Sequence, residues 1–290
     1  MAQAVGTLTF RRATFDSSRT IVMGVVNVTP DSFSDGGAWG DTAQAIAHGG
    51  KLVSDGADVV DVGGESTRPG AQPVPVKEEA ARVLPVVRAL AGAVTVSVDT
   101  YKAEIAAAAL DAGAEIVNDV SGGALDPELL AVVARHRAFV VLGHLRGTPA
   151  EMNAHARYDD VVGEVKRELS ERIDAALSAG VAGARILVDP GLGFAKSGAH
   201  NLELLARLGD ICALGCPVVV GASRKSFLGA LTGRAVDDRE VATAAANTAA
   251  ILGGARMVRV HDVRAQKDAI AVADAIVRAR GGAAAGRAAS

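Results

Sequence analysis

Short apolar runs rich in β-branched residues alternate along this chain with alanine-rich or amphipathic segments. Eight such runs are present, at 21–28, 58–63, 94–99, 115–119, 139–144, 186–190, 217–223 and 257–262. Helix-like segments lie between them, and clear examples are 42–57, 77–91, 102–114 and 158–180. Strands that alternate with helices predict parallel βαβ units. Eight units in a chain of 290 residues predict a (β/α)8 TIM barrel.

The two ends of the chain predict additions to this barrel. The stretch "TLTFRRATF" (7–15) predicts a short N-terminal hairpin that covers the barrel bottom. We expect one domain over 1–280 and a disordered tail over 281–290, because the tail consists of small residues with little to bury. The alternative fold is a doubly wound open sheet, which usually carries a G-x-G-x-x-G turn after its first strand. The segment "NVTPDSFSDGG" (27–37) lacks that spacing, which favours the barrel.

Composition narrows the class of protein without naming a function. The chain is 49% hydrophobic and 22% charged with a net charge of −3, which is typical of a globular protein and gives no basic surface for nucleic acid. No run approaches the roughly 20 apolar residues of a membrane span, and the first twenty residues lack the apolar core of a signal peptide. We therefore expect a cytoplasmic protein with no nucleic-acid or membrane partner. Cys212 and Cys216 have no second pair to complete a zinc site and are expected to be buried and reduced.

Polar side chains stand at the C-terminal end of every predicted strand. In chain order they are Asn27, 65–68, Asp99, Asn118 with Asp119, His144, Asp189, 223–225, and Arg259 with His261. A barrel gathers its strand ends around one mouth, so these groups are expected to converge there. The alternative for an isolated residue, such as Asp99 or Ser121, is a helix N-cap. Polar groups at all eight strand ends favour one shared site.

The segment 27–37 follows the first predicted strand and is long for a strand-to-helix connection. Its Pro, Asp, Ser and Gly residues are those of an ordinary turn. Phe33, however, has no reason to lie in a solvated turn, and a long loop with an aromatic residue is typical of a functional lid.

Six segments closely resemble the dihydropteroate synthase family: "MGVVNVTPDSFSDGG", "GADVVDVGGESTRPGA", "VSVDTYKAEIAAAALDAGAEIVNDVSGG", "ILVDPGLGFAKSGAHNLELL", "VVVGASRKSFLG" and "VRVHDV". The resemblance runs from about Met23 to about Asp262. It implies the barrel fold and an enzyme that joins 6-hydroxymethyl-7,8-dihydropterin diphosphate to 4-aminobenzoate. The products would be 7,8-dihydropteroate and pyrophosphate. The resemblance further implies Mg²⁺ as cofactor, sulfonamides as inhibitors and a homodimer.

The same resemblance assigns roles to residues. The implied pterin site holds Asp99, Asn118, Asp189, Phe194, Gly221 and Lys225. Thr67, Arg68, Arg259 and His261 would grip the diphosphate, and Asn27 would contact the metal. Phe33, Pro69 and Ser223 would form the aminobenzoate slot, with 27–37 and the segment "GGESTRPGA" closing over it. The implied catalytic set is Asn27, Arg68, Lys225, Arg259 and His261.

These residue types suit the implied chemistry. A carboxylate can accept two N–H donors from an aminopyrimidinone edge, and an amide can read a mixed edge. The barrier lies in C–O cleavage, so cations that stabilise a departing diphosphate are needed more than a strong base. A lone histidine such as His261 is more often structural, but beside Arg259 it is better read as a phosphate ligand.

One departure and two alternatives accompany the resemblance. Gly143 stands where the family commonly has Met, which removes apolar contact worth about 1–3 kcal/mol unless a neighbour such as Leu145 fills the space. The nearest alternative enzyme is a methyltetrahydrofolate-dependent methyltransferase domain, which would not need "DSFSDGG", "STRPG" or "SRKSFLG". The other alternative is an inactive paralogue that binds a pterin or a partner protein.

Overall fold

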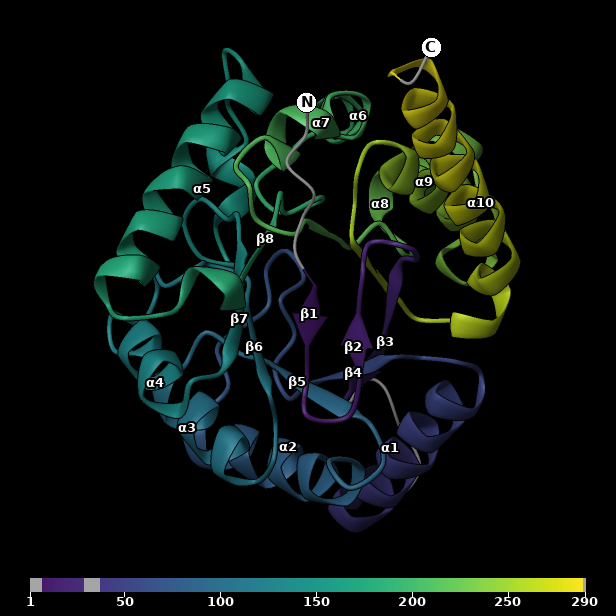
Figure 1. Ribbon diagram of the computed structural model, residues 1–290. Helices are drawn as coiled ribbons and strands as arrows, with labels where there is room; N and C mark the ends of the chain where they lie inside the picture. The colour runs from purple at the N-terminus through teal and green to yellow at the C-terminus, as the bar shows by residue number, and fades with distance from the viewer. Residues whose placement is uncertain (1–6, 29–36, 289–290) are drawn as a thin grey trace.

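A barrel of eight parallel strands, surrounded by helices, dominates the computed structural model (Figure 1), which describes residues 7–28 and 37–288, with side chains for 7–28 and 42–280. The strands are β3 (Ile21–Asn27), β4 (Val59–Gly63), β5 (Thr95–Asp99), β6 (Ile116–Asp119), β7 (Phe139–Gly143), β8 (Ile186–Asp189), β9 (Val219–Val220) and β10 (Met257–Val260). They follow the order β8-β7-β6-β5-β4-β3-β10-β9, and a parallel bridge between Val188 and Val218 brings the two edges together. The predicted barrel and its eight strands are confirmed.

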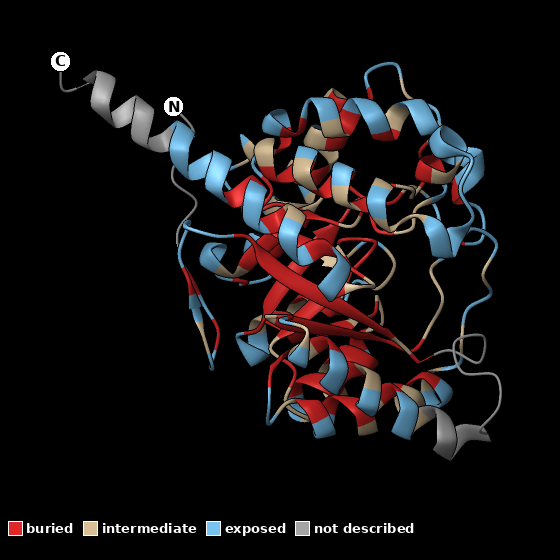
Figure 2. Ribbon diagram, turned by 90° about the vertical axis from the view of Figure 1, so that its right-hand side faces the viewer, coloured by how far each residue is buried: buried red, intermediate tan, exposed pale blue. Residues whose placement is uncertain are grey.

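The helices form the outer layer and turn their apolar sides to the strands, as the burial colouring in Figure 2 shows. Their bounds are α1 (Gly37–Ser54), α2 (Val76–Leu90), α3 (Ala103–Asp111), α4 (Leu129–His136), α5 (Val161–Ser178), α6 (Gly198–Ala206), α7 (Leu208–Cys212), α8 (Ser226–Thr232), α9 (Glu240–Leu252) and α10 (Val263–Ala288). Short 3-10 turns lie at Met152–His155, Gly183–Arg185 and Val236–Asp238. Within the described residues, none of these helices combines the length and apolar character needed to cross a bilayer.

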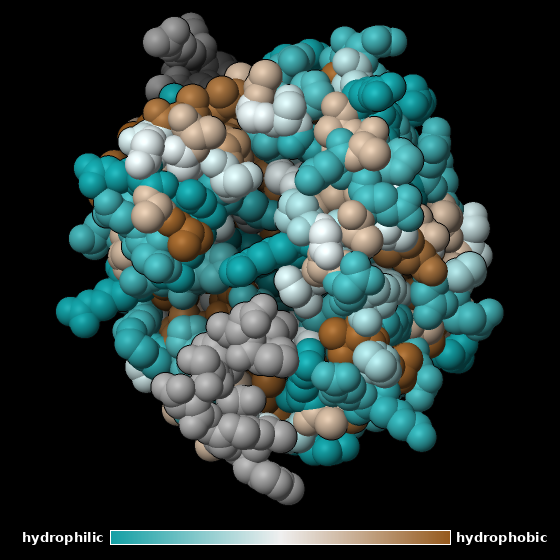
Figure 3. All heavy atoms as spheres, turned by 180° about the vertical axis from the view of Figure 1, so that it is seen from behind, coloured by the Kyte–Doolittle hydropathy of each residue, from teal (hydrophilic) through white to brown (hydrophobic). Residues whose placement is uncertain are grey.

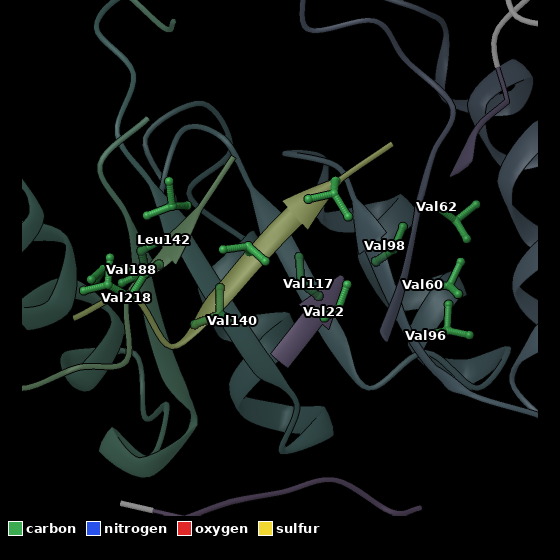
Figure 4. Close-up of a cluster of buried hydrophobic side chains, with 14 of the residues drawn as sticks. Val22, Val60, Val62, Val96, Val98, Val117, Val140, Leu142, Val188 and Val218 are labelled. Carbon is green, nitrogen blue, oxygen red and sulfur yellow. The ribbon is translucent and has the colours of Figure 1, made fainter. Parts of the chain in front are cut away.

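Successive strand residues point to opposite faces, and this alternation divides the core in two. Outward-facing side chains pack beneath the helices (Figure 4), and those labelled there are Val22, Val60, Val62, Val96, Val98, Val117, Val140, Leu142, Val188 and Val218. A second cluster fills the lower barrel interior with inward-facing residues such as Met23, Val59 and Val141. Nearer the C-terminal ends of the strands, polar side chains take over at the site, and they are Asp61, Asp99, Asn118, Asp189 and Arg259.

The hairpin closes the N-terminal end of the barrel, as the sequence predicted. Strands β1 (Leu8–Thr9) and β2 (Thr14–Phe15) pair antiparallel. Leu8, Phe10 and Phe15 belong to the interior cluster, and the Phe10 ring lies 4.7 Å from the ring of Phe139 at the start of β7. Their burial removes apolar surface at the barrel bottom from water.

Other expectations about the chain have mixed outcomes. Cys216 is buried, Cys212 is half-buried, and both are free thiols. Helix α10 is assigned through Ala288, and the division into a domain over 1–280 and a disordered tail over 281–290 stays a prediction.

Candidate active site at the C-terminal mouth of the barrel

The polar strand ends meet at one mouth of the barrel. Seen from the side opposite the hairpin, the surface is hollowed near its centre and surrounded mainly by hydrophilic side chains (Figure 3). The pocket is lined by Thr67, Asp99, Asn118, Val120, Gly143, His144, Asp189, Gly191, Leu192, Phe194, Gly221, Lys225 and Arg259. Eight predicted site residues therefore share this pocket: Thr67, Asp99, Asn118, Asp189, Phe194, Gly221, Lys225 and Arg259. Their roles toward ligands stay predictions.

The remaining predicted residues lie around this pocket or outside the described part of the chain. Asn27 ends β3 beside Gly63 of β4 and is half-buried. Arg68 and Pro69 are exposed on the loop after β4. Ser223 lies on the loop after β9, His261 directly follows β10, and Phe33 lies outside the described residues.

A charge network links four strands at the pocket. The Nε atom of Arg259 donates to Oδ2 of Asp61 at 2.6 Å, and its Nη2 atom donates to Oδ2 of Asp99 at 2.7 Å. The Nδ2 atom of Asn118 donates to the same Oδ2 of Asp61 at 2.9 Å. Asp61 is fully buried, and it is a site residue that the sequence analysis missed. The available signal was a charged residue inside an apolar strand, "VVDVG", at the inward position between Val59 and Gly63.

The buried carboxylate of Asp61 and the half-buried carboxylate of Asp99 share one guanidinium in this network. Burial raises the pKa of Asp99 to about 7, Arg259 opposes that rise, and the charge of Asp61 adds to it. The pKa of Arg259 is raised, because the two carboxylates outweigh the effect of its burial. A ligand that offers N–H donors to these oxygens would find a preformed acceptor surface.

Asp189 and Lys225 form the opposite side of the pocket. The backbone N–H of Gly191 donates to Oδ1 of Asp189 at 2.7 Å, and burial raises the pKa of this carboxyl. The Nζ atom of Lys225 lies 3.9 Å from the ring centroid of Phe194. Burial lowers the pKa of Lys225 to about 8, although Asp189 favours its charged form. The Asp189 carboxylate and the Lys225 ammonium group therefore line the same pocket as the Phe194 ring.

The loop after β9 brings Ser223 against His261. The Nδ1 atom of His261 lies 2.9 Å from the Ser223 hydroxyl, which also accepts from the His261 backbone N–H at 3.2 Å. Arg224 adopts a left-handed φ of 58° and is anchored to α9, where Thr243 accepts from its backbone N–H and Glu240 pairs with its guanidinium at 2.8 Å. Burial, followed by Arg259, lowers the pKa of His261 to about 3, so its imidazole is neutral at pH 7.

A buried histidine and lysine hold the loop that carries Phe194. The Nζ atom of Lys196 lies 2.9 Å from Nδ1 of His144 and 2.9 Å from the carbonyl oxygen of Phe194. The Nε2 atom of His144 lies 2.9 Å from Glu168. Burial lowers the pKa of His144 to about 3, so the neutral ring accepts from Lys196 and donates to Glu168. Lys196 was missed because its partner is 52 residues away in sequence.

The pocket wall at Gly143 is filled by the backbone rather than by the side chain of Leu145. A Cβ atom at Gly143 would lie 2.8 Å from the carbonyl oxygen of Asp119 and 2.8 Å from Cα of Val120. Val120 lines the pocket, whereas Leu145 packs in a separate cluster with Met152. The strand ends of β6 and β7 therefore approach too closely for a larger residue at this position.

The loop after β4, which carries Thr67 and Arg68, is tied to the barrel by a second charge cluster. The Nζ atom of Lys102 lies 2.5 Å from Glu65, from Glu79 and from the carbonyl oxygen of Val74. Tyr101 also donates to Glu65 at 2.8 Å. This cluster joins residues up to 37 positions apart, so no local pattern in the sequence predicts it.

We expect Glu65→Gln to loosen this loop. The amide would keep one acceptor for Tyr101 but would remove a charge-assisted bond from Lys102, which lowers the free energy of unfolding by about 1 kcal/mol. Urea unfolding measures that loss. The KM for the substrate that contacts Thr67 and Arg68 should rise. The control is Glu78→Gln, which changes a more exposed ion pair with Arg82 and should leave that KM unchanged. Equal KM values for Glu65→Gln and wild type would contradict the role of Glu65 in holding this loop.

The fold and the site together define an enzyme of the pterin-binding class. A family model described as "Pterin binding enzyme" matches residues 23–261 of this chain. The chain belongs to the dihydropteroate synthase family.

Three similar proteins support this assignment. A dihydropteroate synthase of Synechocystis is 45% identical over 263 residues, covering 90% of this chain and 91% of that protein. The structure of Xanthomonas albilineans dihydropteroate synthase with 4-aminobenzoic acid has a TM-score of 0.88 and 48% identity, covering 94% of this chain and 98% of that one. The Yersinia pestis enzyme in complex with a sulfonamide drug has a TM-score of 0.88 and 41% identity, covering 94% and 99%.

Proposed function

We propose that this protein condenses 6-hydroxymethyl-7,8-dihydropterin diphosphate with 4-aminobenzoate to give 7,8-dihydropteroate and pyrophosphate in folate biosynthesis. The observation that carries the proposal is the pairing of Asp99 and Asp189 with Arg259 and Lys225 in one pocket. The Xanthomonas albilineans enzyme, which shares this fold at 48% identity, was solved with 4-aminobenzoic acid. Sulfonamides are the corresponding expected inhibitors, because a Yersinia pestis relative binds one.

The pocket accounts for binding of the first substrate. Asp99, Asp189 and the side-chain oxygen of Asn118 would present acceptors to the N–H groups of the pterin. Phe194 supplies an apolar surface beside the ring, with Lys225 held against it. The guanidinium of Arg259 is held at two of its nitrogens, so its remaining N–H groups are free to reach an anion at the mouth.

The reaction breaks a C–O bond and forms a C–N bond. The amine nitrogen attacks the exocyclic carbon of the pterin, pyrophosphate leaves with the C–O electron pair, and the nitrogen loses one proton to solvent. Arg259, Lys225 and Arg68 would stabilise the departing negative charge. His261 would donate one N–H to a phosphate oxygen. The roles of Thr67, Ser223 and Pro69 follow the family resemblance.

The proposed cofactor is Mg²⁺. The described part of the chain holds no group of three or more His, Cys, Asp or Glu side chains that could cage a metal. Magnesium commonly binds through one or two protein oxygens together with substrate phosphates, and the Asn27 amide at the end of β3 fits that donor set. When bound with the diphosphate, the ion would neutralise charge on the leaving group.

A pyrophosphate-release assay with both substrates, with and without Mg²⁺, tests this function. Pyrophosphate that appears only when both substrates and Mg²⁺ are present supports the proposal. Release at an equal rate without 4-aminobenzoate, or no release under any condition, overturns it. A methyltransferase domain or an inactive paralogue, the alternatives from the sequence, would give no release.

Asn27→Ala tests the metal assignment separately. We expect the Mg²⁺ concentration for half-maximal activity to rise about tenfold, because one oxygen ligand is lost. Affinity for the pterin alcohol, which lacks the diphosphate, should be unchanged in calorimetry. An equal loss of affinity for the alcohol and the diphosphate would place Asn27 in the pterin pocket instead.

We also propose a cytoplasmic homodimer. Exposed apolar side chains on neighbouring elements support an interface, and they include Leu231, Val236, Val241, Val272 and Ile276. The free thiols of Cys212 and Cys216 are typical of a reducing compartment. Sedimentation velocity of the purified protein decides between monomer and dimer.

A further inference from the structure

Asp61 occupies the centre of the charge network without lining the pocket. It is fully buried in β4, where its Cα pairs with Val25 of β3 and Ser97 of β5. One carboxylate oxygen, Oδ2, accepts from both Arg259 and Asn118. The other oxygen, Oδ1, and the Ser97 hydroxyl are buried without a hydrogen-bond partner among the described residues.

We infer that Asp61 is a positioning residue that sets the donor and acceptor pattern of the pterin pocket by orienting Asn118 and Arg259. The inference rests on the proposed function and deepens it. Asp61 acts through two residues that line the pocket, whereas Asp61 itself stays below it.

Asp61 determines which end of the Asn118 amide faces the pocket. Its two ends have nearly the same shape but opposite hydrogen-bonding character. With Nδ2 placed 2.9 Å from Oδ2 of Asp61, the amide donates to a carboxylate. The flipped amide would place two acceptors at that distance, which is repulsive. Asp61 therefore leaves the carbonyl oxygen of Asn118 as the end available to a ligand, and that end accepts from a pterin N–H.

Asp61 also orients the guanidinium of Arg259. It is held at Nε by Asp61 and at Nη2 by Asp99, so its plane and direction are determined by two strands. Without the Asp61 charge, the guanidinium could turn to Asp99 alone and form a bidentate pair. That pair would occupy the oxygen that Asp99 otherwise offers to the ligand. Asp61 thus keeps one oxygen of Asp99 available.

Electrostatics supply a readout that packing alone would not change. Several charged groups influence Asp99: Arg259 on β10, Asp61 on β4, Glu79 on α2, Asp119 on β6 and Lys225 beside α8. Burial raises the pKa of Asp99 to about 7, Arg259 lowers it, and Asp61 raises it. Asp61→Asn removes a raising charge and frees Arg259 for Asp99, so both effects lower this pKa. Because the pterin is bound by the carboxylate, affinity is lost as the pH falls through that pKa.

Asp61→Asn with the matched control Ser97→Ala tests the inference. Calorimetry at pH 5.5 to 8.5 measures the Kd of the pterin diphosphate, and steady-state kinetics measure the aminobenzoate KM. For Asp61→Asn we expect the Kd of the pterin diphosphate to be about tenfold higher at pH 8. The loss of pterin affinity on acidification should occur at lower pH than in wild type, and the aminobenzoate KM should be unchanged. Ser97→Ala, a change at the paired position of the next strand, should behave as wild type.

The outcomes separate this inference from the proposed function. A wild-type protein that binds no pterin diphosphate would refute the proposed function. A folded Asp61→Asn variant with wild-type affinity and an unchanged pH dependence of that affinity would overturn only the role of Asp61. If Asp61→Asn fails to fold in thermal unfolding, Asp61→Glu replaces it, because that side chain keeps the charge but moves it by one methylene. Weaker pterin binding in Asp61→Glu supports the inference, and wild-type affinity overturns it.

Discussion

Arg259→Met is expected to abolish detectable pyrophosphate release and to lower the free energy of unfolding by about 3 kcal/mol at pH 8. The guanidinium is the direct hydrogen-bond partner of both Asp61 and Asp99, and its side chain is only 21% exposed. Its removal leaves the buried carboxylate of Asp61 and the half-buried carboxylate of Asp99 without their shared cation, and the methionine cannot donate to either. Urea unfolding of the variant and of wild type measures the loss of stability.

The pH dependence of that loss distinguishes charge from packing. Arg259 lowers the pKa of Asp99, so the variant raises it further above the value in the unfolded chain. When the pKa of a carboxyl is raised in the folded state, the free energy of unfolding of the protein falls as the pH rises toward that pKa. The difference in the free energy of unfolding between variant and wild type should therefore be smaller at pH 5 than at pH 8. Arg264→Met, at an exposed position on α10, serves as the control. A difference that stays constant with pH would show that lost packing causes the defect.

Asp189→Asn is expected to raise the Kd of the pterin diphosphate about thirtyfold, or about 2 kcal/mol, without loss of stability. The backbone N–H of Gly191 donates to Oδ1 of Asp189, so an asparagine would direct its oxygen to Gly191 and its NH2 group to the ligand. A donor would then face the N–H donors of the pterin. Calorimetry measures the affinity, and thermal unfolding measures the stability.

Stability should be maintained because burial already raises the pKa of Asp189 and so opposes its charge. The exposed Asp174→Asn on α5 is the control for a general effect of the substitution. Unchanged pterin affinity in Asp189→Asn would remove Asp189 from the pterin site. A drop in unfolding temperature together with the loss of affinity would indicate a structural role instead.

The barrel was predictable because its signals are local. Each strand was a short β-branched run, and each run appears in the structure within a few residues of its predicted bounds, although β9 is reduced to Val219–Val220. The hairpin was predictable from the stretch 7–15, and the structure adds that Phe10 and Phe15 pack in the interior cluster. The convergence of Asp99, Asn118, Asp189 and Arg259 followed from the geometry of parallel strands, whose C-terminal ends share one edge.

The partners of these residues were not predictable from local pattern. Lys102 reaches Glu65 and Glu79, and Lys196 reaches His144, through contacts that depend on how loops fold back over the strands. Each of these lysines resembles an ordinary surface cation in the sequence. Phe33, which the sequence analysis placed in the aminobenzoate slot, lies outside the described residues, so that role stays a prediction.

The sequence by itself determined the alternation of strands and helices and the set of polar groups at the mouth, because both depend on residues adjacent in the chain and on a period of two. Only the tertiary structure decided which donor meets which acceptor. Arg259 pairs with Asp61 across 198 positions and with Asp99 across 160, and those contacts exist because β10 closes against β3 in one register. A shift of that register by one residue would turn Arg259 out of the barrel and leave both carboxylates without it.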